Sequence, residues 1–283
     1  MRDHLRVTAR PAAPVALLLA CHPVPTIAVT AMATALAASA DNDATTVVAA
    51  AVAVLTGQLS IGWSNDLIDV RRDRAAGRTD KPLATGTVAP RHVIVATVMA
   101  LVATVVASLA LGWRAGLAQV VVVGCGWAYN AGLKSTRVSP VPFFVAFGAL
   151  PAVATLARPD HAWPPWWALL AGGLVGVAAH FGNVLPDLAD DAATGVRGLP
   201  HRVGRFPSAA TASTCAVAAA GVAVWGSSPP WAWGMIALVV AVSLAGTGLV
   251  VARRRPSSEA AFYTTMAVAA LGVTLIAATS ALA

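Results

Sequence analysis

The stretch TTVVAAAVAVLTGQLSIGWSNDLIDVRRDRAAGRTDKPLATG, residues 45–86, decides the fold class, because an apolar run passes directly into a dense cluster of charges. Residues 45–64 carry no charged side chain, and a helix needs about 20 such residues to cross the hydrocarbon core of a bilayer. Residues 65–81 then hold four aspartates and five basic side chains. The stretch therefore predicts a membrane-spanning helix that carries its chemistry at one end.

The composition of the whole chain agrees with this interpretation. Of its 283 residues, 58% are hydrophobic and 11% are charged, and the mean hydropathy is +0.73. A soluble domain usually carries about 25% charged residues. The net charge of +7 would suit a nucleic acid, but the basic residues lie in short loops between apolar runs, so we exclude that partner. The three cysteines lie far apart without a CxxC spacing, so we expect neither a disulfide framework nor a zinc site.

Nine apolar runs are candidates to cross a membrane, and together they predict an all-α polytopic membrane protein with one domain over residues 1–283. The first run is not followed by a convincing cleavage site, so we expect a retained helix rather than a signal peptide. The runs lie near 15–39, 45–64, 92–112, 115–133, 139–157, 164–185, 207–226, 229–251 and 260–282.

The basic residues predict the orientation, because cytoplasmic loops are enriched in Lys and Arg. With the N-terminus and its Arg2, Arg6 and Arg10 inside, all but Arg114 and Arg158 of the 19 basic residues fall on the inner side. The C-terminus is then outside. Tryptophans that fit an interfacial belt fall at the outer ends, namely Trp163, Trp166, Trp167, Trp231 and Trp233. The composition suggests a bacterial cell membrane.

Two acidic clusters follow the second and the sixth runs, and they repeat each other at an offset of 118 residues. The first site is Asn65, Asp69, Asp73, Gly77, Pro82 and Gly86, and the second is Asn183, Asp187, Asp191, Gly195, Pro200 and Gly204. Such agreement favours two pseudo-equivalent four-helix units, about 11–138 and 139–255, with a ninth helix at 260–282. Both acidic clusters then lie at the cytoplasmic face.

The spacing within each cluster predicts a metal site. Residues four apart lie on one helix face, so Asn65, Asp69 and Asp73 stack with Asp66 beside them, and the second cluster is expected to stack likewise. Close carboxylates repel one another unless a cation lies among them, and all-oxygen ligation suits Mg²⁺. The glycines and prolines are expected to end the helices and fold the basic loops back over the site. Asp80 and Asp190 fall outside the repeat, and their roles stay open.

These motifs resemble those of the UbiA superfamily of intramembrane prenyltransferases. The residues that carry the resemblance are Asn65, Asp66, Asp69 and Asp73 with Lys81-Pro82-Leu83 and Gly86, and Asp187, Asp190 and Asp191 with Gly195 and Leu199-Pro200. The resemblance covers the whole chain. It implies nine helices, two Mg²⁺ ions held by the two motifs, ionisation of an isoprenoid diphosphate, and transfer of the prenyl group to a lipophilic acceptor, commonly an aromatic ring.

The expected site residues follow from the motifs and the resemblance together. Mg²⁺ ligands are expected at Asn65, Asp66, Asp69, Asp73, Asn183, Asp187 and Asp191. Diphosphate contacts are expected at Asn65, Arg78, Lys81, Lys134 and Arg197. The expected catalytic residues are Asp69, Asp73, Asp187, Asp191 and Tyr129. His180 stays open between a core histidine and a group that removes a proton from the acceptor.

One departure and three rival functions are relevant. Many members of the superfamily carry an Arg-Pro pair where this chain has Cys21-His22-Pro23, which puts a carboxylate-bearing acceptor in doubt. The single glutamate, Glu259, lies far along the chain. The rivals are a terpene cyclase, which begins with the same ionisation, a secondary transporter, whose charges would lie at the bilayer midplane, and a CDP-alcohol phosphotransferase, whose longer motif is absent.

Overall fold

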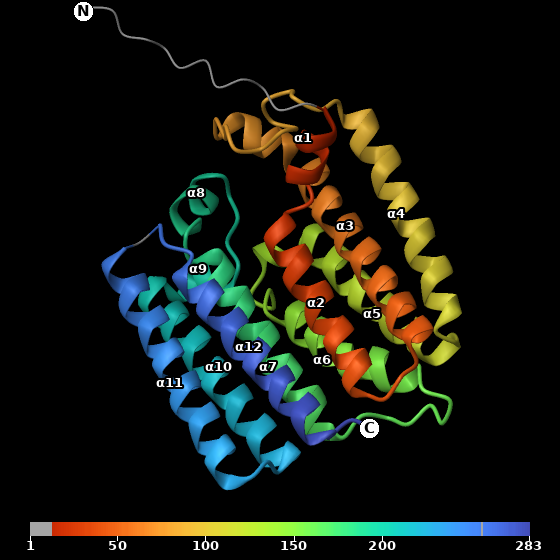
Figure 1. The fold of residues 1–283 in the computed structure, drawn as a ribbon. Coiled ribbons are helices and arrows are strands. Elements are labelled where there is room, and N and C mark those ends of the chain that lie inside the picture. The colour runs from red at the N-terminus through yellow and green to blue at the C-terminus, as the bar shows by residue number, and fades with distance from the viewer. Residues whose placement is uncertain (1–12, 256) are drawn as a thin grey trace, which may run out of the picture.

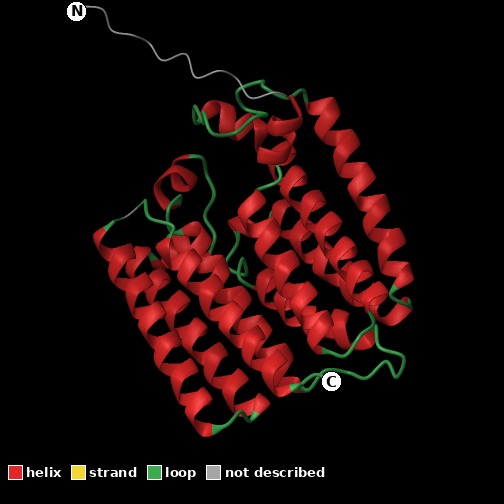
Figure 2. Cartoon of the chain, in the orientation of Figure 1, coloured by secondary structure: helices red, strands yellow, loops and turns green. Residues whose placement is uncertain are grey.

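The computed structural model describes residues 13–255 and 257–283, and within them every regular element is a helix (Figures 1 and 2). Along the chain these are α1 (Ala13–Leu19), α2 (Pro23–Ser39), α3 (Ala44–Ala75), α4 (Pro90–Ala110), α5 (Trp113–Asn130), the 3-10 helix η1 (Leu133–Ser135), α6 (Val141–Leu156), α7 (Trp166–Val184), α8 (Leu188–Ala193), α9 (Leu199–Val203), α10 (Arg205–Ser227), α11 (Trp231–Arg254) and α12 (Ala260–Thr279). The all-α prediction is confirmed. The predicted inner position of Arg2, Arg6 and Arg10 lies outside the described residues.

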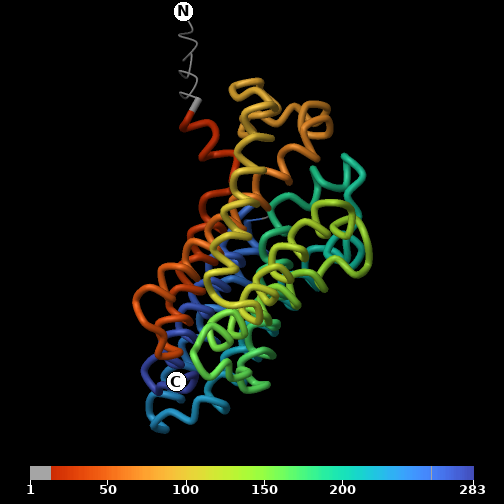
Figure 3. The backbone as a smooth tube through the Cα atoms, turned by 90° about the vertical axis from the view of Figure 1, so that its right-hand side faces the viewer, coloured from red at the N-terminus to blue at the C-terminus, as the bar shows by residue number. Residues whose placement is uncertain are grey.

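Six helices form a closed ring, in which each packs against the next in the order α2, α3, α5, α6, α7 and α12. Helix α4 packs outside the ring against α3 and α5, whereas α10 and α11 pack outside it beside α7 and α12. The long helices run along one common direction (Figure 3). The loop after α3 and the segment containing α8 and α9 lie at the same end of the bundle (Figure 1). The ring therefore surrounds an interior that opens toward both acidic motifs.

The chain is an integral membrane protein. Within the described residues, six helices are long and apolar enough to cross a membrane: α3, α4, α7, α10, α11 and α12. Helices α2 and α6 are apolar but shorter, with 17 and 16 residues, and α5 has 18. Prolines lie in the first turn of both α2 and α6, where their missing N–H is tolerated, and α6 also contains Pro151 in its interior. The count of nine spans stays a prediction.

The first predicted span, near 15–39, is wrong as a single helix. The chain turns between α1 and α2, and His22 takes a left-handed conformation with φ of 56°. Pro23 explains the break, since a proline disfavours the α conformation in the residue before it. The turn packs against α3 at Gly62, where a Cβ atom would overlap the carbonyl of Cys21, and Trp63 donates a 2.9 Å hydrogen bond to Leu17 O. His22 is thereby placed beside the first motif.

The two acidic motifs differ in local structure. Helix α3 continues to Ala75, so the predicted stack of Asn65, Asp69 and Asp73 on one helix is confirmed. The matching prediction for the second motif is wrong, because α7 ends at Val184 and α8 begins only after Asp187. Pro186 is the reason, since it lacks the N–H that would continue the α7 hydrogen-bond ladder.

Three of the repeated glycines, Gly77, Gly195 and Gly204, closely follow the end of a helix as predicted, whereas Gly86 lies in a turn. Each of the four adopts a positive φ: Gly77 at 67°, Gly86 at 74°, Gly195 at 88° and Gly204 at 85°. A residue with a Cβ atom pays a steric cost in this region of conformational space, whereas glycine does not. Equivalent backbone turns therefore follow both motifs, even though the helices before them differ. The larger division into two four-helix units stays a prediction.

Candidate active site

Both acidic motifs line one polar cavity of about 380 Å³ at the end of the ring. Side chains reach it from α2, α3, the loop after α3, α5, η1, α7, the segment after α7 and α12. Ten of the predicted site residues line it, namely Asn65, Asp69, Asp73, Arg78, Lys81, Tyr129, Lys134, Asn183, Asp187 and Asp191. The structure thus brings together residues that are more than 100 positions apart in the sequence.

Two predicted residues, Asp66 and Arg197, are not among the described residues that line this cavity. Asp66 is 1% exposed, and its Oδ1 lies 2.6 Å from Lys81 Nζ and 3.0 Å from His22 Nε2. Arg197 is exposed on the loop after α8, where its carbonyl accepts a hydrogen bond from Arg202. The contacts show Asp66 holding Lys81 and His22 in place, and the ligand roles expected of Asp66 and Arg197 stay predictions.

Asp69 is held by two cations. Its Oδ2 lies 2.5 Å from Lys134 Nζ, and its Oδ1 lies 3.2 Å from Arg72 NH1. Lys134 also approaches Asn65 Oδ1 at 3.4 Å, and it is only 7% exposed. A buried lysine and a buried aspartate compensate each other here, because either charge alone would lack solvation.

The loop after the second motif holds the backbone around Lys134. A Cβ atom at Gly198 would overlap Lys134 O, so only a glycine allows this close approach. Ser139 Oγ accepts a 3.0 Å hydrogen bond from Leu199 N and lies 3.0 Å from His180 Nε2. His180 is buried and belongs to this connection between the loop and α7. Its position supports the core-histidine interpretation.

Arg78 links the two motifs. It donates two hydrogen bonds to Asp80, at 2.8 and 2.7 Å, and its NH1 lies 3.6 Å from Asp187 Oδ1. The hydrogen bonds from Arg78 hold the pKa of Asp80 below its ordinary value. Burial raises the pKa of Asp187, with Arg78 opposing the shift and Asp191 adding to it. Asp187 is therefore a carboxylate without full charge compensation.

The donor set fits Mg²⁺. Within the described residues, no three His, Cys, Asp or Glu side chains lie close enough together to enclose a metal by themselves. Mg²⁺ does not need such a cage, because it keeps several waters and binds through one or two carboxylates and substrate phosphate oxygens. Asp69 Oδ1 is buried, and apart from its 3.2 Å ion pair with Arg72 it accepts no hydrogen bond among the described residues. The carboxylate and amide oxygens around the cavity are ligands of the kind that Mg²⁺ prefers.

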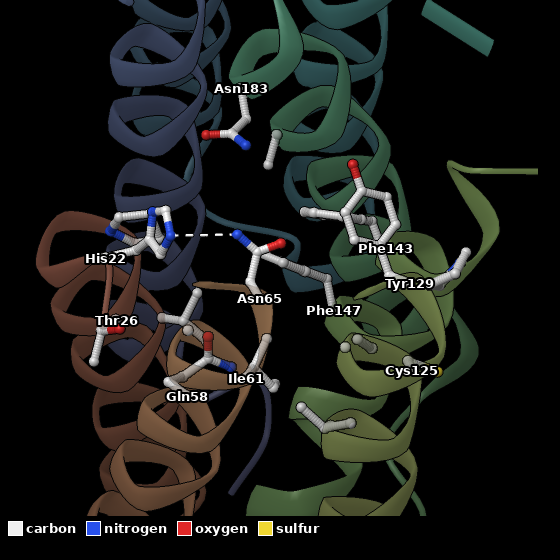
Figure 4. Close-up of a pocket in the computed structure, with 18 of the residues that line it drawn as sticks. His22, Thr26, Gln58, Ile61, Asn65, Cys125, Tyr129, Phe143, Phe147 and Asn183 are labelled. Carbon is white, nitrogen blue, oxygen red and sulfur yellow. Dashed lines mark hydrogen bonds between the residues drawn. The ribbon is translucent and has the colours of Figure 1, made fainter. Parts of the chain in front are cut away.

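A second, apolar cavity of about 200 Å³ continues from the polar one into the ring (Figure 4). His22, Asn65, Tyr129 and Asn183 line both cavities. The ring of Tyr129 packs edge-on against Phe143, with centroids 5.0 Å apart. The rest of the lining is mainly apolar, with Thr26, Gln58 and Asn130 among its polar members. A molecule with a charged head and an apolar tail would have a matching environment at each end.

Several lining residues were not expected from the sequence, and His22, Glu259 and Tyr263 are three of them. His22 was noted only as a departure from a family pattern, yet its side chain points into the cavity beside Asn65, 3.5 Å away (Figure 4). Glu259 and Tyr263 reach the polar cavity from the start of α12. The position of Glu259 far along the chain gave no signal, because only the closure of the ring by α12 brings it back to the motifs.

Comparison with known proteins decides the family. The model of the UbiA prenyltransferase family matches residues 26–274, which is most of the chain. The chain belongs to the UbiA prenyltransferase family. No curated protein sequence matches this UbiA family member.

Solved structures show that the fold is shared. A UbiA homolog from Archaeoglobus fulgidus bound to GPP and Mg²⁺ is 13% identical, with 93% of this chain and 99% of that chain covered at a TM-score of 0.68. The apo structure of a UbiA homolog from Aeropyrum pernix K1 is 18% identical, with 89% and 96% covered at 0.73. A digeranylgeranylglyceryl phosphate synthase is 15% identical, with 95% and 98% covered at 0.63. Because the identities are this low, the similarity to these structures shows only that the chain shares the UbiA fold.

Proposed function

We propose that this protein is a Mg²⁺-dependent prenyltransferase that ionises an isoprenoid diphosphate and transfers the prenyl group to a lipophilic acceptor, releasing diphosphate. One observation carries the proposal: both aspartate motifs line one polar cavity that continues into an apolar, aromatic-walled one. Membership of the UbiA family supports it, as do homologous structures that hold GPP or DMAPP with Mg²⁺.

The polar cavity binds the diphosphate. The expected Mg²⁺ ligands are Asn65, Asp66, Asp69, Asp73, Asn183, Asp187 and Asp191, and the metal would supply positive charge that stabilises the departing diphosphate. Arg78, Lys81 and Lys134 line the same cavity and are cationic donors for phosphate oxygens. They balance the acidic side chains before substrate arrives, and they exchange carboxylate contacts for phosphate contacts when it binds.

The apolar cavity accommodates the hydrocarbon part of the isoprenoid donor. When the bond between the allylic carbon and the diphosphate oxygen breaks, the electron pair leaves with the oxygen and the allyl group becomes positive. The Tyr129 and Phe143 rings wall the junction of the two cavities, and aromatic faces attract a cation. The apolar lining excludes water that would otherwise capture the cation. The acceptor's electron pair forms the new carbon bond, and the acceptor loses a proton.

The position in the cell is part of the proposal. We place the active site and the N-terminus on the cytoplasmic side of a bacterial cell membrane, with residues 1–283 as one domain of nine spans. The basic residues around the polar cavity support this orientation, because cytoplasmic loops are enriched in Lys and Arg.

Diphosphate release tests the function. Purified protein in detergent is incubated with dimethylallyl, geranyl, farnesyl and geranylgeranyl diphosphate, with Mg²⁺ or with EDTA, and with or without a membrane extract as the source of acceptor. We expect release that requires Mg²⁺, rises with the extract and is lost in Asp187→Ala. A cyclic product without the extract would instead indicate a terpene cyclase, and no release from folded protein would contradict the proposal.

A further inference from the structure

A second apolar cavity, of about 50 Å³, lies deeper in the bundle than the first. Its walls come from α2, α6, α7, α10 and α12, and the residues around it are entirely apolar. Phe147 and Leu150 of α6 line both this cavity and the first apolar cavity. The two side chains therefore stand between the two spaces.

The two cavities follow one another along the same helices. On α2, Val29 lines the first cavity and Leu36 lines the second, and on α12 the same holds for Met266 and Gly272. These positions are six or seven residues apart, which is roughly 10 Å along a helix axis. Since both helices lead away from the polar cavity in this order, the deeper cavity continues the line that runs from the diphosphate site through the first apolar cavity.

Phe147 separates the first apolar cavity from the deeper one. Its ring stacks on Phe143, with centroids 6.3 Å apart and the planes at 14°, and it lies in the cavity wall (Figure 4). Leu150, one turn later on α6, is 2% exposed. On its α7 and α10 sides the deeper cavity is lined almost entirely by small residues, which are Ala168, Ala171, Gly172, Ala219, Ala220 and Ala223, while larger apolar side chains from α2, α6 and α12 complete the lining. The partition is therefore made by large side chains of α6, and the α7 and α10 side of the space beyond it by small ones.

We propose that Phe147, supported by Leu150, sets the length of the isoprenoid chain, and that the deeper cavity is a subsite for additional isoprene units when that partition is removed. The inference rests on the proposed function and specifies its donor. In the native protein the chain ends at Phe147, so the shorter allylic diphosphates are preferred over geranylgeranyl diphosphate.

The preference for shorter chains has a steric and a hydrophobic cause. A longer tail has to displace a stacked aromatic ring before it reaches the deeper cavity, and close-packed interiors resist such displacement. Truncation of Phe147 to alanine joins the two spaces and gives the added isoprene units an apolar environment. Since one methylene in a hydrophobic pocket changes kcat/KM by about ten-fold or more, the ratio of kcat/KM for geranylgeranyl over geranyl diphosphate should rise at least about ten-fold.

The experiment measures this ratio by diphosphate release for the wild type, Phe147→Ala and a matched control. Phe144→Ala is the control, because Phe144 is the neighbouring phenylalanine of α6, is exposed, and lines neither apolar cavity in the described structure. Phe147→Leu, a smaller truncation, should shift the ratio in the same direction if the alanine variant does not fold. Ala219→Leu, which fills the deeper cavity, should reverse the gain when it is combined with Phe147→Ala.

A rise in the ratio in the Phe147 variants, its reversal by Ala219→Leu and no change in Phe144→Ala would support the inference. An unchanged ratio in folded Phe147 variants would overturn it, as would a wild type that already prefers geranylgeranyl diphosphate. Both of these failures leave the proposed function standing. If no protein, the wild type included, releases diphosphate from any chain length, the proposed function fails and this inference fails with it.

Discussion

At the scale of single residues, the site is organised by lysines that come from outside the motif helices. Lys81 of the loop after α3 contacts Asp66, and Lys134 of η1 contacts Asp69. Each carboxylate is buried, and burying a lone charge is costly. The lysines therefore compensate the buried carboxylates of the first motif before substrate binds, and they place positive charge where a diphosphate would lie.

Lys134→Met tests the buried pair with Asp69. The substitution removes the buried lysine and leaves the Asp69 carboxylate with the more exposed Arg72, so we expect the free energy of unfolding to fall by about 3 kcal/mol, seen as a lower Tm in detergent. Adding Asp69→Asn removes the uncompensated charge and should restore much of the Tm without restoring diphosphate release. A Tm in Lys134→Met equal to that of the wild type would contradict this account of the pair.

Asp187 should show the stability cost of an uncompensated carboxylate. Its pKa is raised in the folded protein, so the folded state holds the proton more tightly than the unfolded state. The protonated side chain therefore adds to the free energy of unfolding at low pH, and this contribution is lost as the pH rises through the raised pKa. Asp187→Asn should therefore have a higher Tm than the wild type at neutral pH, and the difference should vanish near about pH 4.

Asp80→Asn is the control, in which we expect the Tm to change in the opposite direction. The pKa of Asp80 is lowered by Arg78, so its contribution to stability is present at neutral pH and is lost as the pH falls. Asp80→Asn should lower the Tm at neutral pH. Shifts of the same sign in both variants would contradict the assigned electrostatics.

At the scale of elements, the sequence predicted wrongly that the second motif lies on one continuous helix. The spacing of Asn183, Asp187 and Asp191 matches that of the first motif, yet Pro186 ends the helix between them. All three still line the polar cavity, because the turn at Pro186 redirects the chain without moving it away. The break before Pro23 has the same cause. Both helix breaks could have been predicted from the positions of the prolines.

Contacts between elements were less accessible from the sequence. Nothing local to His22 or Glu259 indicates that each lies at the polar cavity, since their positions depend on the turn after α1 and on the packing of α12 in the ring. The close approach of helices was equally hidden, because a glycine in an apolar helix has the same local pattern whether a neighbour touches it or not.

The contact between α6 and α7 gives a prediction about two glycines. A Cβ atom at Gly176 would overlap the carbonyl of Phe143, so Gly176→Ala should separate the helices and lower the stability by about 1–3 kcal/mol. Gly246 of α11 has open space around its missing Cβ, so Gly246→Ala should raise stability by about 0.5–1 kcal/mol. Denaturation in detergent measures both, and destabilisation by Gly246→Ala or none by Gly176→Ala would contradict the packing.

At the scale of the whole molecule, one ring of helices explains why motifs 118 residues apart share a site. Helices α3 and α7 lie on that ring, and their motif ends point the same way (Figure 1). The sequence predicted this from the pattern of basic loops and the repeated offset. The depth and partition of the apolar path could not be predicted, because they depend on which faces of α2, α6 and α12 meet.

Labelling of single cysteines tests the proposed orientation. In a variant whose three native cysteines are replaced, Thr79→Cys marks the loop after α3 and Ser228→Cys marks the turn between α10 and α11, both of them exposed. A membrane-impermeant maleimide should label Ser228→Cys in intact cells and Thr79→Cys only after permeabilisation. The reverse pattern would place the site on the outer face, and equal labelling of both positions would contradict the predicted span count.

The central claim is that α3 and the segment after α7 together hold a Mg²⁺-bound diphosphate. The most direct measurement is the Kd of geranyl thiolodiphosphate, which binds without ionising, for the wild type, Asp73→Asn, Asp187→Asn and the control Asp160→Asn at the opposite end of the bundle. We predict binding that requires Mg²⁺, weakens at least about ten-fold in each motif variant, and is unchanged in the control. Binding that is indifferent to EDTA, or to the loss of either motif carboxylate, would contradict a shared site.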